Sequence, residues 1–293
     1  MSLKHPIIGV TGSSGAGTST VLRVFDRIFA ELGLKAAVVE GDAFHAYDRD
    51  QLRLTLDRAA IRGENFSLFG PAGNLLERLE AMLREYGEKG SGIFRHYLHT
   101  EAEALAAGQA PGSFTPWQRL PADTDLLFYE GLHGGYVSDE VNIARHMDLL
   151  IGVVPVINLE WIQKIKRDID ERGHRPEDVM GTILRRMPDY VNYITPQFSR
   201  TDVNFQRVPL VDTSNPFTVR EIPRPEESLV VVHFNELTRL GSDFDRIRRE
   251  LPGAFRSHDQ TLVVPGVLQE QAMDVVLRPA IERLARIRTT TSA

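Results

Sequence analysis

Short apolar runs alternate with amphipathic segments along most of the chain, and this alternation predicts an α/β fold. Residues 6–10 form a short apolar run typical of a buried strand, and residues 19–32 have their apolar positions on one face of a helix. Apolar runs at 36–40, 125–130 and 148–154 are bounded by polar residues, as expected of parallel strands covered on both faces. The pattern therefore predicts a mostly parallel sheet with helices on both faces.

The second half of the chain continues this alternation without a repeat, a low-complexity tract or a clear linker. We therefore predict a single domain over residues 1–293, with a mobile lid insertion at about 158–200. Pro176 suits the first turn of a helix in this insertion. The other expected elements are a helix at 74–86 that stops before the glycines of 87–92, helices at 158–172 and 268–287, and strands at 208–211, 229–234 and 261–264.

A glycine-rich segment follows the first strand and matches a phosphate-binding P-loop at every fixed position but one. Glycine lets the backbone approach anionic oxygens closely, and the N–H groups that open the next helix point at the phosphate. Thr18 stands where the motif expects a lysine, whose ammonium reaches the β and γ phosphates. The chain is therefore expected to bind a nucleoside triphosphate and to need another cation. The predicted nucleotide-binding residues are Gly12, Ser13, Ser14, Gly15, Ala16, Gly17, Thr18, Ser19 and Thr20.

Two carboxylates follow predicted strands and should meet the P-loop in one cleft. Ligands of open parallel sheets bind beyond the carboxyl ends of the strands, and Asp42 and Glu130 occupy such positions. Glu130 stands where a Walker-B acid would bind Mg²⁺ together with the Ser19 hydroxyl, or it is a solvated strand-end residue. Asp42 suits a general base that deprotonates an attacking hydroxyl, although a turn-capping aspartate has the same signature.

The lid insertion carries a row of charged residues. Lys164, Arg167, Asp168 and Arg172 fall on one face of the predicted helix. Either this helix brings cations to the transferring phosphoryl group in place of the missing lysine, or the residues form ordinary ion pairs on a solvated face. Arg185 and Arg186 extend the basic surface, or are cations at a helix end.

A smaller basic group lies at Arg95, His96 and His99. It could bind a second phosphate on the acceptor, although histidines on a surface loop are common. We find no pattern that resembles a zinc site or a Ser/His/Asp triad.

Composition limits the classes of partner. The 293 residues are 42% hydrophobic, enough for a large core without metals or disulfides. The 40 acidic residues outnumber the 34 basic ones, and the net charge of -6 disfavours nucleic-acid and membrane partners. Cysteine is absent, which excludes disulfides and thiol regulation. No apolar run approaches membrane-spanning length and the N-terminus lacks a signal-peptide core, so we expect a cytoplasmic protein. We also expect a homo-oligomer of unspecified subunit number.

Several separate motifs, in order along nearly the whole chain, resemble those of bacterial phosphoribulokinases. They lie at 12–20, 40–45, 128–133, 158–168, 198–209 and 212–217. The resemblance implies a P-loop, nucleoside-monophosphate-kinase-like fold. It also implies that ATP, with Mg²⁺, phosphorylates the C1 hydroxyl of D-ribulose 5-phosphate to give ribulose 1,5-bisphosphate. Bacterial members similar to this chain also carry threonine in the P-loop, so Thr18 is compatible with activity.

The resemblance also implies roles for individual residues. Asp42 matches the catalytic base of the family, Glu130 its Mg²⁺ ligand, and Asp168 a second essential carboxylate. Lys164 and Arg167 match cations near the transferred phosphate. Residues that match sugar-phosphate binders, or a basic pair in the lid, are His45, Arg49, His99, Arg172, Arg185 and Arg186.

The chain departs from the bacterial family pattern in one respect, and two other functions remain as alternatives. Bacterial members are typically activated by NADH through dispersed arginines, whose positions here hold Glu31, His233 and His258, so NADH activation is expected to be weak or absent. The segment 164–173 also resembles the lid helix of uridine kinases, which makes a nucleoside acceptor the nearest alternative. The other alternative, suggested by Thr18, is a non-catalytic nucleotide sensor.

Overall fold

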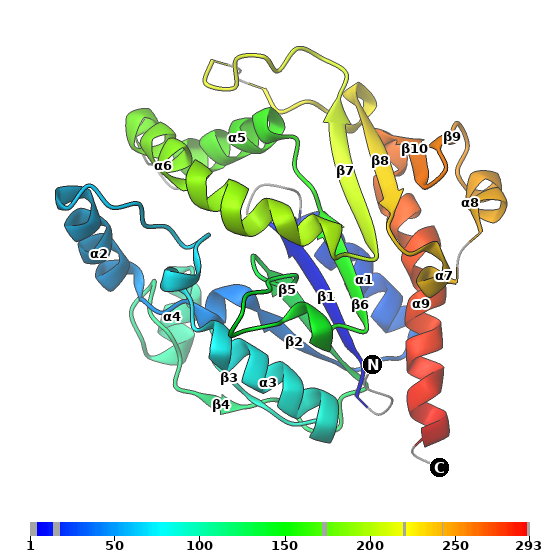
Figure 1. Ribbon diagram of the computed structural model, residues 1–293, viewed down its shortest axis with the longest axis horizontal. Coiled ribbons are helices and arrows are strands. Elements are labelled where there is room, and N and C mark those ends of the chain that lie inside the picture. The colour runs from blue at the N-terminus through cyan, green and yellow to red at the C-terminus, as the bar shows by residue number, and fades with distance from the viewer. Residues whose placement is uncertain (1–4, 14–17, 172–174, 219–220, 242, 292–293) are drawn as a thin grey trace.

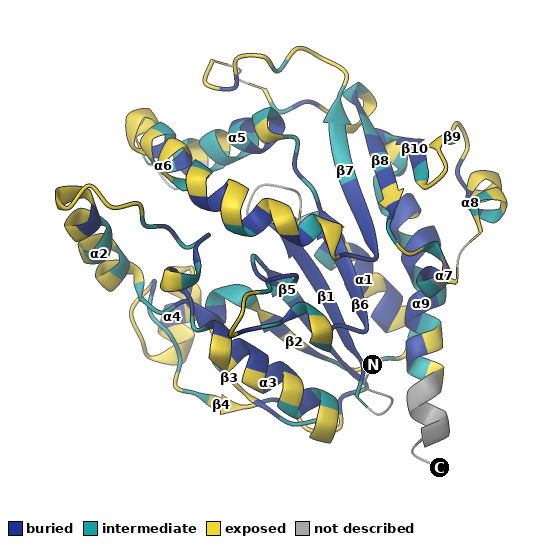
Figure 2. Ribbon diagram, in the orientation of Figure 1, coloured by how far each residue is buried: buried dark blue, intermediate teal, exposed yellow. Residues whose placement is uncertain are grey.

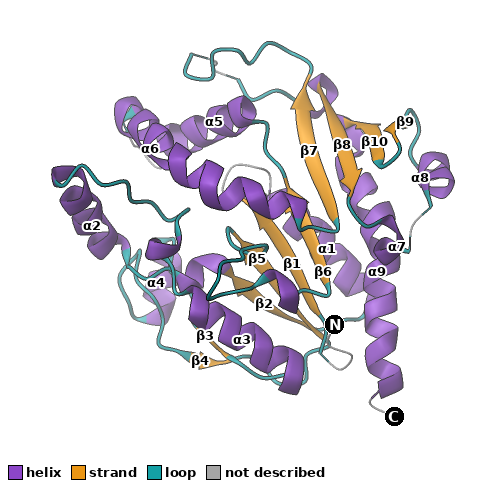
Figure 3. Ribbon diagram, in the orientation of Figure 1, coloured by secondary structure: helices purple, strands orange, loops and turns teal. Residues whose placement is uncertain are grey.

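The computed structural model describes residues 5–13, 18–171, 175–218, 221–241 and 243–291. Within these ranges no helix has the length and apolar character needed to cross a membrane. The chain forms a central sheet with helices on both sides and a helical layer over one edge (Figures 1 and 3). The predicted α/β class is therefore confirmed.

The central sheet has eight strands in the order β2-β5-β1-β6-β7-β8-β10-β9. The ladders among β2, β5, β1, β6 and β7 are parallel, whereas β8, β10 and β9 extend the sheet by antiparallel pairing. The mostly parallel sheet was predicted, but its antiparallel extension was not. The strands are β1 (Ile7–Gly12), β2 (Ala36–Glu40), β5 (Leu126–Gly131), β6 (Leu149–Val153), β7 (Val203–Pro209), β8 (Ser228–Phe234), β9 (Phe255–His258) and β10 (Thr261–Pro265).

Two strands of the central sheet differ clearly from the prediction, for physical reasons. β7 lies at Val203–Pro209 rather than at 208–211, because Asn204 and Gln206 interrupt the apolar signal of its first half. All four residues of the edge strand β9 are exposed, so this strand carries no alternation of buried and exposed positions for a pattern to detect.

The two faces of the sheet bury alternate residues of each strand. Phe128 of β5 packs against Phe25, with ring centroids 4.6 Å apart, under α1 (Thr18–Leu32) and α9 (Gln269–Thr291). The short helices α7 (Leu237–Leu240) and α8 (Phe244–Glu250) contact α9. Leu127 and Tyr129 belong to the opposite core, which includes α3 (Leu76–Lys89). Figure 2 shows the central strands buried.

The helix α3 runs three residues past its predicted end. The predicted break at 87–92 is wrong at its start, because the helix continues through Gly87 and ends before Gly90, whose φ is +67°. One glycine inside a helix costs about 1 kcal/mol, which the packing of the fully buried Tyr86 offsets. Gly90 then provides the left-handed C-terminal residue that ends many helices.

The predicted lid region forms a helical layer over the carboxyl ends of the parallel strands (Figure 1). It contains α5 (Ile157–Lys166), a π-helical turn (Arg167–Glu171), α6 (Pro176–Asp189), a second π-helical turn (Tyr190–Ile194) and a 3-10 turn (Thr195–Ser199). Pro176 opens α6 as predicted. Across the gap in this view lies α2 (Arg49–Ile61), and α4 (Glu101–Ala107) and the two-stranded sheet of β3 (Ile93–Phe94) and β4 (Gln118–Arg119) complete the fold.

Candidate active site

The carboxyl ends of β2 and β5 bring acidic residues together. Glu40 at the end of β2 is the direct neighbour of Glu130 in β5. The next residues approach so closely that a Cβ on Gly131 would lie 2.7 Å from the Cα of Gly41. Asp42 follows Gly41 on a 3-10 turn (Gly41–Phe44), so it lies at the same sheet edge as Glu130. The predicted convergence of the two carboxylates is therefore present.

The strand that leads into the P-loop ends beside these carboxylates. β1 pairs with both β5 and β6, and its last residue, Gly12, lies opposite Val153. Ser13 follows, fully buried, and its hydroxyl donates to Glu160 Oε1 at 2.5 Å. Thr20 Oγ1 accepts from Arg23 at 3.1 Å. The predicted phosphate ligands Ser14, Gly15, Ala16 and Gly17 lie outside the described residues, as do the side chains of Thr18 and Ser19, so their contacts stay predictions.

His45 connects Asp42 to a buried asparagine. His45 Nε2 lies 3.1 Å from Asp42 Oδ1, and His45 Nδ1 lies 2.8 Å from Asn74 Oδ1. The Asn74 amide nitrogen donates to the carbonyls of Leu68 and Gly70, so Asn74 Oδ1 faces His45 as an acceptor. His45 Nδ1 must then carry a proton. The other ring nitrogen, Nε2, then faces Asp42.

These neighbours keep Asp42 in its carboxylate form. Partial burial raises the pKa of Asp42, but the hydrogen bond and charge of His45, with the charges of His99 and Arg186, outweigh it and hold the pKa below its usual value. The side chain remains 39% exposed, so a substrate hydroxyl can reach it. An ionised, accessible carboxylate is the form that a general base requires.

The predicted acceptor-binding residues gather around the same carboxylate. His99 Nε2 lies 3.7 Å from Asp42 Oδ2 and 3.9 Å from Glu40 Oε2. The backbone carbonyl of His99 accepts from the Arg49 guanidinium at 3.1 Å. His99, which is far in sequence from His45 and Arg49, thus joins these two residues on one side of the site.

Arg95 supports the turn that carries Asp42. Its guanidinium donates to the carbonyls of Ala43 and His45 at 2.8 and 2.6 Å and stacks on Phe114 and Trp117. Burial lowers the pKa of Arg95 to about 10. These contacts hold the turn that carries Asp42, and the possible phosphate-binding role of Arg95 stays a prediction. His96 is exposed, with its ring against Phe94.

The lid cations meet at the facing sides of α5 and α6. Lys164 forms an ion pair with Asp168, and Arg167 Nε lies 3.3 Å from Asp168 Oδ1, so the predicted ion pairs are present. Yet the Lys164 side chain is only 12% exposed, and burial, together with the charge of Arg186, lowers the pKa of Lys164. The charged residues around Lys164 and Asp168 are therefore largely buried, rather than spread over a solvated helix face.

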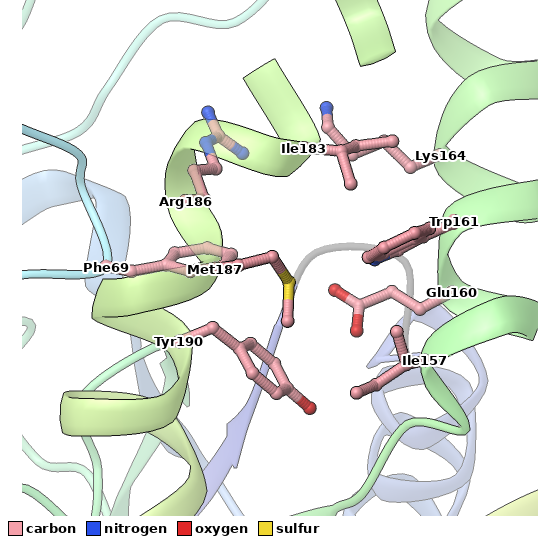
Figure 4. Close-up of a pocket in the computed structure, with 9 residues that line it drawn as sticks. All are labelled: Phe69, Ile157, Glu160, Trp161, Lys164, Ile183, Arg186, Met187 and Tyr190. Carbon is pink, nitrogen blue, oxygen red and sulfur yellow. The ribbon is translucent and has the colours of Figure 1, made fainter. Parts of the chain in front are cut away.

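Arg186 joins the two halves of the site. The side chains of Arg186 and Lys164 line one pocket between α5 and α6 (Figure 4). The charge of Arg186 also contributes to the low pKa of Asp42. The guanidinium lies over the Phe69 ring, 5.2 Å from the ring centroid. Arg185 is exposed on α6, and Arg172 lies outside the described residues.

The donor set suits a magnesium ion shared with a nucleotide. Among the described residues no group of three or more His, Cys, Asp and Glu side chains could hold a metal alone. Mg²⁺ usually binds through one or two carboxylates together with substrate phosphates and water. Glu130, at the strand end beside the P-loop strand, fits this arrangement.

Three residues of the site were not selected from the sequence. Glu40 ends β2 within reach of His99, Asn74 orients His45, and Glu160 accepts from Ser13. Glu160 precedes Lys164 by four residues, so both lie on the same face of the predicted helix. This spacing was a weak indication that Glu160 belongs to the site. Asn74 had no such signal, because its role depends on a contact between distant segments.

Comparison with known proteins agrees with this geometry. The model of the Phosphoribulokinase / Uridine kinase family matches residues 7–214. The chain is 56% identical to the chromosomal phosphoribulokinase of Cupriavidus necator, over 97% of each chain, and 55% identical to a probable phosphoribulokinase of Escherichia coli K12, over 97% of this chain and 98% of that one. The solved phosphoribulokinase from Rhodobacter spheroides superposes with a TM-score of 0.89 at 49% identity, over 98% of this chain and 100% of that one. The chain therefore belongs to the phosphoribulokinase/uridine kinase family.

Proposed function

We propose that this protein is a phosphoribulokinase, which transfers the γ-phosphoryl group of ATP to the C1 hydroxyl of D-ribulose 5-phosphate and releases ribulose 1,5-bisphosphate. The full-length identity of 52–56% to proteins named phosphoribulokinase supports this assignment. The observation that carries it in the structure is the meeting of Asp42, the P-loop strand and the lid cations at one sheet edge.

In the proposed mechanism Asp42 accepts the proton of the C1 hydroxyl as that oxygen attacks the phosphorus atom. His45, held by Asn74, keeps Asp42 ionised and fixes its direction. Lys164, Arg167 and Arg186 neutralise charge on the phosphoryl group, which compensates for the missing P-loop lysine. Asp168 holds Lys164 and Arg167 in place.

Further groups complete the proposed site. Glu130 and Ser19 would hold Mg²⁺, which when bound neutralises phosphate charge. The 5-phosphate of the sugar suits the basic side of the site that lies beyond Asp42. The residues proposed to bind the sugar phosphate are His45, Arg49, His99 and Arg172, and the lid pair Arg185 and Arg186 completes the proposed substrate-binding residues. A homo-oligomer and a cytoplasmic location stay expectations from the sequence.

A coupled assay of ADP release, run with a panel of acceptors, tests this function. The panel contains D-ribulose 5-phosphate, other pentose and hexose phosphates, uridine and cytidine. We expect D-ribulose 5-phosphate to have the highest kcat/KM. Turnover of uridine without turnover of D-ribulose 5-phosphate would establish the uridine-kinase-like alternative instead. ATP binding without turnover of any acceptor would favour the nucleotide sensor.

A further inference from the structure

A buried carboxyl group lies where the P-loop strand meets the lid, and the proposed mechanism does not use it. Glu160 is in the first turn of α5 and is 6% exposed. Its Oε1 accepts from the hydroxyl of Ser13 at 2.5 Å, and Ser13 is itself fully buried. This bond joins two segments 147 residues apart in sequence. It links the first residue of the P-loop segment after β1 to the helix that carries Lys164.

The same carboxyl group also faces α6. Glu160 lines a cavity of about 20 Å³ between α5 and α6, which is enough for about one water molecule. Figure 4 shows the carboxyl group directed from α5 toward Met187 and Tyr190, with Arg186 and Lys164 around the same space. Glu160 thus contacts the P-loop segment on one side and the lid cavity on the other.

The charged and titratable groups that face Glu160 come from both lid helices. Burial raises the pKa of Glu160 to about 7, although the Ser13 hydrogen bond and the nearby cations oppose this shift. These cations are Arg186 on α6, Lys164 on α5 and Arg167 on the following turn, and Tyr190 also faces the carboxyl group. The side chain therefore changes charge close to neutral pH.

We propose that Glu160 is a positioning residue that fixes the entry of the P-loop against the lid, through Ser13, and so couples nucleotide binding to the placement of Lys164 and Arg186. This inference rests on the proposed function. Loss of a buried hydrogen bond leaves its partner unsatisfied, and a displacement of about 1 Å in a phosphoryl-transfer site can cost about 10² in rate. Glu160 thus acts through its neighbours rather than on the substrate.

Because Glu160 can ionise, ATP binding should be coupled to its protonation, which a residue with a packing role alone would not show. A bound triphosphate brings negative charge to the P-loop and raises the pKa of Glu160 further. Binding should therefore add protons to Glu160 near pH 7, and the affinity for ATP should fall as the pH rises through this range. ATP titrates in the same range, so the measured quantity is the difference between the wild type and Glu160→Gln, which cannot ionise.

The variants Ser13→Ala, Glu160→Ala, Glu160→Gln and the double variant Ser13→Ala/Glu160→Ala test the proposal. Calorimetry gives their ATP affinity and proton uptake, the latter from buffers of different ionisation enthalpy. The matched control is Glu80→Gln, because Glu80 of α3 is also a buried glutamate, 9% exposed, but pairs with Arg145 and His146 of the 3-10 turn Ala144–His146. Far-ultraviolet circular dichroism and thermal melts establish that each variant is folded.

We expect both alanine variants to bind ATP about tenfold more weakly, and the double variant to be no weaker than Glu160→Ala alone, because both remove one interaction. Glu160→Gln keeps the acceptor oxygen, so it should stay within about threefold of the wild type at pH 7 while taking up fewer protons. Wild-type affinity in Ser13→Ala and Glu160→Ala, additive losses, or equal proton uptake in Glu160→Gln would each overturn the proposal.

This experiment is separable from the test of the proposed function. ATP affinity and proton uptake are measured without an acceptor, so they do not depend on which hydroxyl is phosphorylated. A protein that fails to turn over D-ribulose 5-phosphate would contradict the proposed activity and leave the Ser13–Glu160 result unaffected. Once an acceptor is known, kcat and the KM for ATP should both worsen in Glu160→Ala.

Discussion

Asp42 and His45 lie three residues apart at the end of β2, with His45 Nε2 3.1 Å from Asp42 Oδ1. The short 3-10 turn Gly41–Phe44 places the imidazole beside the carboxylate, and Asn74 fixes the ring from its other side. The local sequence therefore brings the pair together, whereas a distant segment orients it. The first two predictions depend on this pair.

Replacing Asp42 by Asn removes the proposed base and keeps its shape. We expect kcat to fall by about 10² to 10⁴, because general bases usually contribute that much, while ATP affinity stays near that of the wild type. Steady-state kinetics and calorimetry measure the two quantities. Asp57→Asn, on the exposed face of α2, is the control and should be unaffected. Full activity in Asp42→Asn would remove Asp42 from the mechanism.

Replacing His45 by Gln should change the pH dependence of catalysis. His45 supplies charge and a hydrogen bond that hold the pKa of Asp42 low, so without them this pKa rises. Asp42 must be ionised to accept a proton. The acidic limb of the kcat/KM profile should therefore move to higher pH. His96→Gln, at an exposed ring, should keep the wild-type profile. An unmoved limb in His45→Gln would show that His45 does not control Asp42.

Replacing Lys164 by Met should slow the reaction more than it weakens sugar-phosphate binding. Lys164 lies among the lid cations, where its ammonium is proposed to meet charge that develops on the transferring phosphoryl group. We expect kcat to fall by about 10² or more with a small change in KM for D-ribulose 5-phosphate. Lys166→Met is the control, because Lys166 is 44% exposed on the same helix. Equal losses in kcat and affinity would indicate a binding role only.

NADH should have little effect on this enzyme. The Glu31 carboxylate lies 2.6 Å from the guanidinium of Arg278 and so takes part in holding α1 against α9. A carboxylate at this position repels a dinucleotide pyrophosphate. We expect less than twofold activation by NADH in assays at subsaturating ATP. Activation of several-fold would show that the enzyme binds NADH in another way.

The buried His133 should make the fold sensitive to acid. Its Nε2 lies 3.0 Å from the carbonyl of Phe69, and burial lowers the pKa of His133 from 6.5 to about 4. The unfolded chain therefore binds more protons between pH 6.5 and 4, and stability is lost as the pH falls through this window. Two and a half pH units correspond to roughly 3 kcal/mol.

Denaturant unfolding of the wild type and of His133→Asn between pH 4 and 7 measures this effect. Other groups, Glu160 among them, titrate in the same window and affect both proteins. The informative quantity is therefore the difference in free energy of unfolding between the wild type and His133→Asn, followed as a function of pH. We expect the wild type to lose more stability than His133→Asn as the pH falls from 6.5 to 4. Parallel curves for the two proteins would contradict the assignment.

The sequence was sufficient for the parallel half of the sheet and for the motifs at its carboxyl edge. Strands covered on both faces need continuous apolar runs, and such runs located β1, β2, β5 and β6 closely. Because parallel strands end at one edge, the positions of Asp42 and Glu130 followed from the strand ends alone. The sequence did not locate the exposed β9 or the correct start of β7, where tertiary packing overrode a weak local pattern.

The tertiary structure decided which side chains contact one another across these motifs. Asn74 beside His45, Arg95 under the turn of Asp42, and Ser13 against Glu160 each join segments between 29 and 147 residues apart. Hydrophobic periodicity reports which face of an element is buried, since burial depends on each residue's own transfer free energy. It carries no information on which polar groups meet, because each hydrogen bond depends on the relative position of two elements that only the assembled fold determines.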